Sequence, residues 1–260
     1  MSLRIISAHG TGIKALGDAS NYLAMFGISP DYPFFQKTSL EDYLDRYFEG
    51  KHLAEYLDWT TQRFKETIVY LAPSLLSYNL ASFEGKNDLE STTICNSVGE
   101  ILEAKCLEVI SDFKGVRFNR IPNNSNEELE KIIGHTREFS KLNADFMKDC
   151  WDLTMSACRN RLRMVKRIFG QERYEVAKQT TVRYSIDDIA VELYLHKTMN
   201  VVSVSKYEIP KPLKHLLYGE YQLLEEMIGV DHDRIGHIQV SLPQERIYDS
   251  WYDNNYEKVG

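Results

Sequence analysis

The sequence predicts an α/β fold in which helices flank one Rossmann-like, doubly wound parallel sheet. Two observations lead to this prediction. Short apolar runs of strand length recur along the chain and alternate with longer segments of helical periodicity. In addition, one of these runs stops at a serine that is followed by two nearby prolines. Such a break indicates a core strand that ends in a loop at the rim of a sheet.

The N-terminal elements follow from apolar runs and one capping signal. Strands are expected over 3–7 and 22–28, and the next over 67–72. Between the last two strands, Ser39-Leu40-Glu41-Asp42 is typical of a helix N-terminus, and 51–64 has the pattern of a second helix. A strand–helix–strand unit requires a right-handed crossover, so the two strands should be parallel.

The remaining elements have helical or strand-like patterns in turn. Prolines at 210 and 212 should open a short helix, because the first helical turn does not need their missing N–H groups. The expected helices are 88–113, 127–170 with breaks, 171–196 and 213–217, and the expected strands are 116–121 and 200–205.

Composition limits the class of protein. The 260 residues are 43% hydrophobic and 27% charged, which suffices for one core, and we expect a single domain over 1–260. No apolar run reaches the ~20 residues of a membrane span and the N-terminus lacks a signal-peptide pattern, so a cytoplasmic location without membrane contact is expected. The four cysteines form no C-x-x-C pair, and we expect reduced core thiols. His232 and His237 are too poorly spaced to indicate a metal site.

Positive charge is concentrated in one segment of this acidic chain. The formal net charge is −7, which by itself disfavours a nucleic-acid partner. Several basic residues between 159 and 183 nevertheless recur at helical spacing and would share one face. This face is either an ordinary solvated surface or a site for a phosphate backbone. The candidate contacts are Arg159, Arg163, Lys166, Arg167, Arg173 and Lys178.

Ser29 is the candidate nucleophile, because it follows the apolar strand 22–28 directly. A strand-to-loop corner can hold a serine Oγ at the sheet rim, although serine is also a common turn residue that merely ends strands. A serine hydrolase is disfavoured. Its nucleophile elbow has the form G-x-S-x-G, and the second glycine is absent from Gly27-Ile28-Ser29-Pro30-Asp31. No convincing acid and histidine partners follow in order.

The chain resembles the tRNA-dependent cyclodipeptide synthases over roughly residues 20–220. The resemblance is carried by the order and spacing of several short segments, none of which is specific alone. They are FGISPDYPFF (26–35), WTTQRF (59–64) with TIVYLA (67–72), VRFNRI (116–121), Phe139, Phe146, Cys150, the pair Tyr184 and Asp188, and SKYE (205–208).

The resemblance implies the catalytic-domain fold of class I aminoacyl-tRNA synthetases without the ATP signature motifs. It also implies an aminoacyltransferase that joins two aminoacyl groups, taken from two aminoacyl-tRNAs in sequence, into a cyclic dipeptide. No cofactor, metal or DNA partner is implied. Ser29 would form the covalent aminoacyl intermediate. Some members carry arginines on the helix that corresponds to 88–113, but here that segment is acidic, so the segment 159–183 is expected to bind the tRNA.

The same resemblance assigns roles to further residues, with departures from the family pattern. Tyr184 and Asp188 correspond to a Tyr-x-x-x-Glu pair that holds the substrate amine, and Tyr207 to a tyrosine that relays a proton in ring closure. Aspartate replaces the longer glutamate, which leaves Asp187 and Glu192 as alternatives, and Glu208 stands where the family has histidine or proline. The substrate-binding residues would be Gly27, Tyr32, Phe35, Tyr70 and Ala72.

Two questions stay open at this point. Tyr70 favours a polar or small-to-medium amino acid, but the sequence does not identify the two amino acids that are joined. The departures at Asp188 and Glu208 are also compatible with a synthetase-like module that binds tRNA without catalysis.

Overall fold

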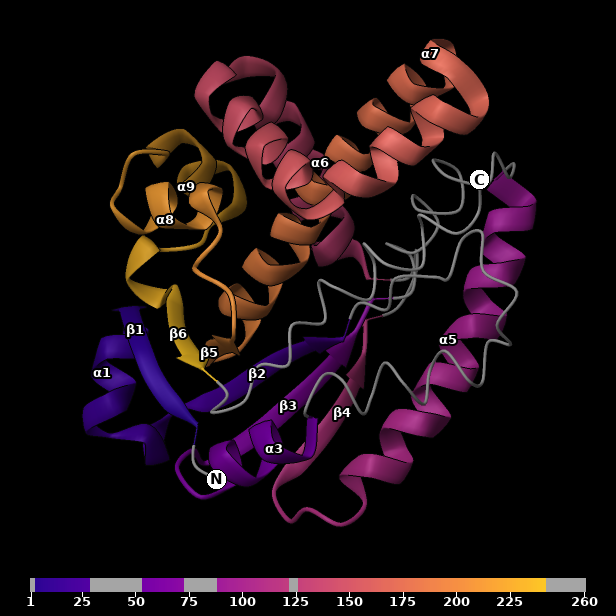
Figure 1. The fold of residues 1–260 in the computed structure, drawn as a ribbon. Helices are drawn as coiled ribbons and strands as arrows, with labels where there is room; N and C mark the ends of the chain where they lie inside the picture. The colour runs from indigo at the N-terminus through magenta and orange to yellow at the C-terminus, as the bar shows by residue number, and fades with distance from the viewer. Residues whose placement is uncertain (1–2, 29–52, 73–87, 122–125, 242–260) are drawn as a thin grey trace.

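The computed structural model of the chain describes residues 3–28, 53–72, 88–121 and 126–241 (Figure 1). The helix expected to begin near Ser39 lies outside these residues. In this part of the chain, no helix combines the length and the apolar character that crossing a membrane requires.

Six strands form one mixed sheet in the order β1-β6-β5-β2-β3-β4. All neighbouring strands are parallel except β1, which pairs antiparallel with β6 at one edge. The five expected strands are present, whereas β6 was not predicted, and the edge strand departs from the wholly parallel sheet that was expected. The strands are β1 (Arg4–Gly10), β2 (Leu23–Ile28), β3 (Glu66–Leu71), β4 (Val116–Arg120), β5 (Val201–Ser205) and β6 (Gly236–Ser241).

The strand order reverses between β2 and β5. From β2 the chain continues outward through β3 and β4, and it then returns to place β5 and β6 on the other side of β2. The loops that leave β2 and β5 therefore diverge to opposite sides. In an open parallel sheet, this divergence opens a crevice at the carboxyl ends of the two central strands, which is where ligands bind.

Helices cover both faces of the sheet (Figure 1). Apolar side chains alternate between the faces of β3, so that Val69 packs with α3 and α5 while Ile68 packs with α6 and the C-terminal part of α7. The two short helices α8 and α9 pack against α6 and α7. The helices are α1 (Thr11–Gly17), α3 (Leu53–Thr61), α5 (Asp88–Ile110), α6 (Glu127–Leu142), α7 (Ala144–Thr198), α8 (Lys211–Leu217) and α9 (Gln222–Ile228).

The long element α7 is two helical arms joined at Gly170. This glycine has φ +86° and ψ −177°, which breaks the helix at the point where the sequence predicted a boundary. The arms contact each other, since the Oγ1 of Thr154 and the Oγ of Ser185 lie 2.7 Å apart in a buried hydrogen bond. Asn143 begins the first arm, and its side chain accepts a hydrogen bond from the N–H of Phe146. The second arm lies over the sheet and brings residues 184–192 toward the crevice.

A partly buried ion pair, whose arginine side chain is 36% exposed, connects the second arm of α7 to α6. The Nε and Nη2 atoms of Arg137 donate to the two carboxylate oxygens of Asp187 at 2.8 and 2.6 Å. The Asp187 side chain is only 3% exposed. Removing one member of such a pair costs several kcal/mol, because the remaining charge loses its charge-assisted hydrogen bonds inside the protein.

We predict that Arg137→Ala lowers the free energy of unfolding by about 2–4 kcal/mol, since it removes both hydrogen bonds to the buried Asp187 carboxylate. Chemical denaturation of the purified protein measures this change. The matched control is Lys211→Ala, which removes an ion pair to Asp152 whose side chains are 60% and 43% exposed. That control should cost less than about 1 kcal/mol. Equal losses in the two variants would contradict the prediction.

Candidate active site

A cavity of about 200 Å³ lies at the carboxyl ends of β2 and β5, where the strand order reverses. It is lined by Met25, Gly27, Ile28, Tyr70, Ala72, Asp188, Glu192, Ser203, Val204, Ser205, Tyr207, Glu208, Pro210 and His237. A larger hollow of about 430 Å³ lies between the end of α6 and the turn before α9, away from the strand ends. We place the candidate site in the smaller cavity, because the ionisable side chains converge there.

Three of the predicted substrate-binding residues, Gly27, Tyr70 and Ala72, line this cavity from neighbouring strands. Gly27 pairs with Tyr70 across the β2–β3 ladder. A Cβ atom at position 27 would lie 2.6 Å from the Tyr70 Oη, so the phenol ring occupies the space beside the glycine. Burial, followed by the charges of Glu192 and Asp188, raises the pKa of Tyr70 well above its usual value. Tyr70 therefore keeps its O–H group.

Asp188 and Glu192 both line the cavity, one helical turn apart on α7. Burial, with the nearby charges of Glu192 and Asp187, raises the pKa of Asp188 to about 7. Burial alone would also raise the pKa of Glu192, but His196, the Ser203 hydroxyl and His237 outweigh it and lower that pKa. The two carboxylates therefore differ, because Glu192 is ionised at neutral pH while Asp188 is poised between its two forms.

The alternative carboxylate Asp187 does not line the cavity. Although it is adjacent to Asp188 in the chain, its side chain lies on another face of the helix and pairs with Arg137. This ion pair assigns Asp187 a role in packing. Of the three acids considered from the sequence, Asp188 and Glu192 lie in the cavity.

The two predicted catalytic tyrosines lie at different depths. Tyr207 follows the end of β5, lines the mouth of the cavity and is 60% exposed. Ser205 holds its backbone, because the Ser205 Oγ donates to the Tyr207 carbonyl oxygen and accepts from the Tyr207 N–H, both at 3.0 Å. Tyr184 is not part of the lining. It packs behind the cavity, with Tyr70 and Ala72, against the core between the sheet and α7.

Sequence reasoning missed two polar residues of the cavity, Ser203 and His237. Ser203 interrupts the apolar run of β5, and its hydroxyl donates to Glu192 Oε1. His237 is opposite Ser203 in the β5–β6 ladder, and its Nε2 donates to the Tyr207 carbonyl oxygen at 2.9 Å. Burial lowers the pKa of His237 despite the opposing effect of Glu192, so the imidazole is neutral. A polar residue within an apolar strand was the available signal for Ser203, while β6 itself was not recognised.

The nucleophile candidate Ser29 lies outside the described residues, as do Tyr32 and Phe35. Ile28, which immediately precedes Ser29 in the chain, is the last residue of β2 and lines the cavity.

The predicted basic segment lies on both arms of α7, near the bend at Gly170. Arg159, Arg163, Lys166 and Arg167 are exposed on the first arm. On the second arm Arg173 is partly buried, and the Lys178 amine lies 4.2 Å from the centre of the Trp151 ring. Lys178 therefore helps to pack the two arms together, and the exposed positive charge is concentrated on the first arm.

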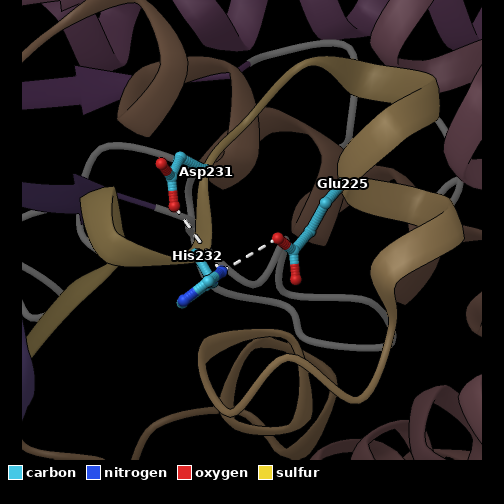
Figure 2. Close-up of side chains that lie close together, drawn as sticks. All are labelled: Glu225, Asp231 and His232. Carbon is cyan, nitrogen blue, oxygen red and sulfur yellow. Dashed lines mark hydrogen bonds and ion pairs between the residues drawn. The ribbon is translucent and has the colours of Figure 1, made fainter.

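Among the described residues, one group of three side chains has ligand-type atoms within 4.8 Å of one another, namely Glu225, Asp231 and His232 (Figure 2). The His232 Nδ1 is 3.0 Å from a Glu225 oxygen, and this hydrogen bond raises the pKa of His232. Asp231 also accepts a hydrogen bond from the N–H of Asp233, at 2.9 Å. We assign this cluster to the turn that leads into β6.

Solved structures of cyclodipeptide synthases share this fold. The chain aligns with one from Fluoribacter dumoffii at a TM-score of 0.64 and 10% identity, over 93% of this chain and 99% of that chain. A Mycobacterium tuberculosis protein whose structure relates these enzymes to type I tRNA synthetases aligns at 0.55 and 15% identity, over 87% and 88%. One from Candidatus Glomeribacter gigasporarum, bound to Phe-tRNAPhe, aligns at 0.52 and 15% identity, over 86% and 89%.

No protein-family model and no curated protein sequence matches the chain. The structural likeness nevertheless confirms the predicted Rossmann-like fold, which is the fold of cyclodipeptide synthases.

We predict that Asp188 titrates with an apparent pKa of about 7. Glu192→Gln should lower this pKa, because it removes a like charge that disfavours the ionised form of Asp188. Carboxyl ¹³C NMR of aspartate-labelled protein measures both values, with Asp188→Asn to assign the signal. Glu108→Gln, which removes an exposed charge on α5, is the control and should leave the titration unchanged. A normal Asp188 pKa in the parent protein would refute the electrostatic description of the cavity.

Proposed function

We propose that the protein is a tRNA-dependent cyclodipeptide synthase, which joins two amino acids from two aminoacyl-tRNAs in sequence through an aminoacyl-serine intermediate. The observation that carries this proposal is the cavity at the reversal of strand order. It brings Gly27, Asp188 and Tyr207 together beside Ile28, the residue that precedes Ser29. The resemblance assigns Gly27, Asp188 and Tyr207 to one site, and the fold is that of cyclodipeptide synthases.

The reaction begins when the Ser29 hydroxyl attacks the ester carbonyl of the first aminoacyl-tRNA. A new ester forms on Ser29, the ester bond to the tRNA breaks, and the serine proton passes to the tRNA hydroxyl. The amine of the bound aminoacyl group then attacks the ester carbonyl of a second aminoacyl-tRNA and forms an amide bond. The ester bond to that tRNA breaks, and the amine proton passes to the departing tRNA hydroxyl, which leaves a dipeptidyl-enzyme. Finally, the free amine of the dipeptide attacks the serine ester, which closes the ring and regenerates Ser29.

Asp188 suits the amine steps. In its ionised form it binds an ammonium group by a charge-assisted hydrogen bond, and with a pKa of about 7 it can also accept a proton as the amine becomes a nucleophile. Tyr207 stands at the mouth, where its phenol can relay a proton during ring closure. Tyr184 packs behind the cavity beside Tyr70, and its role is to position the wall around the amine.

We predict that Ser29→Ala abolishes covalent labelling by aminoacyl-tRNA, because it removes the hydroxyl that forms the aminoacyl ester in the proposed mechanism. Asp188→Asn keeps the shape of the side chain but loses its charge, so it should still acylate while forming cyclic dipeptide at least about tenfold more slowly. Tyr207→Phe should accumulate dipeptidyl-enzyme. Intact-protein mass spectrometry of quenched reactions distinguishes these species, and mass spectrometry of the products detects the cyclic dipeptide.

Thr93→Ala is the control for Ser29→Ala, since it removes an exposed hydroxyl on α5 and should leave labelling unchanged. Label that persists in Ser29→Ala would exclude Ser29 as the nucleophile. Binding of aminoacyl-tRNA without acylation would point instead to a non-catalytic tRNA-binding module.

We further propose that the exposed cations of the first arm of α7 contact the tRNA backbone. Arg163→Glu with Arg167→Glu should weaken binding of aminoacyl-tRNA. The double variant should also reduce the slope of log affinity against log salt by about 0.7–0.9 for each lost phosphate contact. Filter binding at several salt concentrations measures the slope.

The matched control reverses two exposed charges on the edge strand β1 and on α1, Arg4→Glu with Lys14→Glu. Both double variants change the net charge equally, so a general electrostatic effect would appear in both. Equal salt slopes for the two variants would place the tRNA on another surface.

A further inference from the structure

The inner end of the cavity holds an ionised side chain, Glu192, that takes no part in the proposed amine chemistry. Ser203 lies two residues before the end of β5 and is in register with Met25 on β2 and His237 on β6. Its hydroxyl donates to Glu192, which is one helical turn beyond Asp188 on α7. Glu192, Ser203 and His237 therefore form the inner end of the cavity, whereas Tyr207 stands at the mouth.

Among the described residues that line the cavity, the carboxylates are the formally charged groups. Asp188, Glu192 and Glu208 contribute carboxylates, and no lysine or arginine is among the described residues that line the cavity. The Ser203 hydroxyl and the neighbouring histidines stabilise Glu192 in its ionised form. One carboxylate suffices for the amine of an aminoacyl group. Glu192, whose carboxylate also lies 3.9 Å from the His196 Nε2, lines the cavity as a second anion that a different part of the substrate can contact.

His237 adds an unused acceptor beside Glu192. Its Nε2 must carry the hydrogen, because its partner is a carbonyl oxygen, and the neutral ring then has a bare Nδ1. This Nδ1 is buried and has no hydrogen-bond partner among the described residues, in a side chain that is 3% exposed. The Nδ1 has essentially no accessible surface, so His237 contributes a buried wall beside Glu192 and does not itself contact a ligand.

These groups favour a ligand that ends in N–H donors and carries a positive charge. An apolar side chain in the same place would further desolvate the Glu192 carboxylate without pairing its charge. A site with unpaired buried polar groups rejects ligands that cannot pair with them, and such discrimination reaches several orders of magnitude.

The spacing of the two carboxylates selects for length. Four helical residues separate Asp188 from Glu192, which corresponds to about 6 Å along the axis. An amino acid whose α-amine is held by Asp188 reaches Glu192 only through an extended side chain. The cavity of about 200 Å³ is large enough, since an apolar cavity of about 150 Å³ already holds a benzene molecule.

We propose that this cavity selects, for the first acyl transfer, an amino acid with a long cationic side chain of the lysine or arginine type, whose end pairs with Glu192. This inference rests on the proposed function, and it assigns the substrate class of the same site. It also narrows the expectation of a polar or small-to-medium amino acid, which came from Tyr70, to a cationic one.

The test varies the amino acid while the set of tRNAs stays the same. One set of tRNAs is charged in turn with lysine, arginine, leucine, methionine or phenylalanine, and the rate of acylation of the full-length protein is measured by intact-protein mass spectrometry. The parent protein should acylate with lysine or arginine at least about tenfold faster than with leucine. Glu192→Gln, which keeps the size of the side chain, should lose this preference, and Glu192→Leu should reverse it toward leucine or methionine.

Glu226→Gln, which removes an exposed charge on α9, is the control and should leave the preference unchanged. Thermal melts of each variant establish that it is folded, and if Glu192→Leu does not fold, Glu192→Gln and Ser203→Ala decide the outcome. Acylation by leucine, methionine or phenylalanine at a rate equal to that of lysine and arginine would overturn this inference and leave the proposed function intact. Absence of acylation by every aminoacyl-tRNA would overturn the proposed function and this inference with it.

Discussion

The candidate site depends on the reversal of strand order between β2 and β5. Because the chain leaves these neighbouring strands in opposite directions, their carboxyl ends border a space that no crossover connection fills. Gly27 and Ser205 reach this space from the two strands, and Tyr70 reaches it from β3. The residues come from segments that are up to about 180 positions apart, and only the sheet topology brings them together.

The second constraint is the placement of two carboxylates on one face of α7. A helix presents residues four positions apart on the same face, so Asp188 and Glu192 enter one cavity while Asp187 turns to α6. Burial raises the pKa of Asp188, whereas Ser203 and the neighbouring histidines stabilise the anion of Glu192 and lower its pKa. The two acids therefore ionise at different pH values. In the proposed function, these two acids of similar chemistry act on different groups, Asp188 on the amine and Glu192 on a side chain.

Most of the fold was predictable because its signals are local. Apolar runs identified the five strands from β1 to β5, and helical periodicity identified α3, α5 and the two arms of α7, with a break close to Gly170. The antiparallel edge was not predictable, because the direction of β1 depends on its pairing with β6 and not on any local period. The short helices α1 and α9 have seven residues each and were missed for a similar reason, since few turns leave little periodicity.

For the site, the sequence by itself determined the candidate residues Gly27, Tyr70, Asp188 and Tyr207, because each belongs to a short segment with a recognisable pattern. Tertiary structure decided which acid enters the cavity, since the Arg137 pair that removes Asp187 joins residues 50 positions apart. It also decided the roles of Ser203 and His237, which become polar neighbours only through the register of β5 and β6. Charge, burial and hydrogen bonding depend on what surrounds a side chain in space, and these contacts are distant in the sequence.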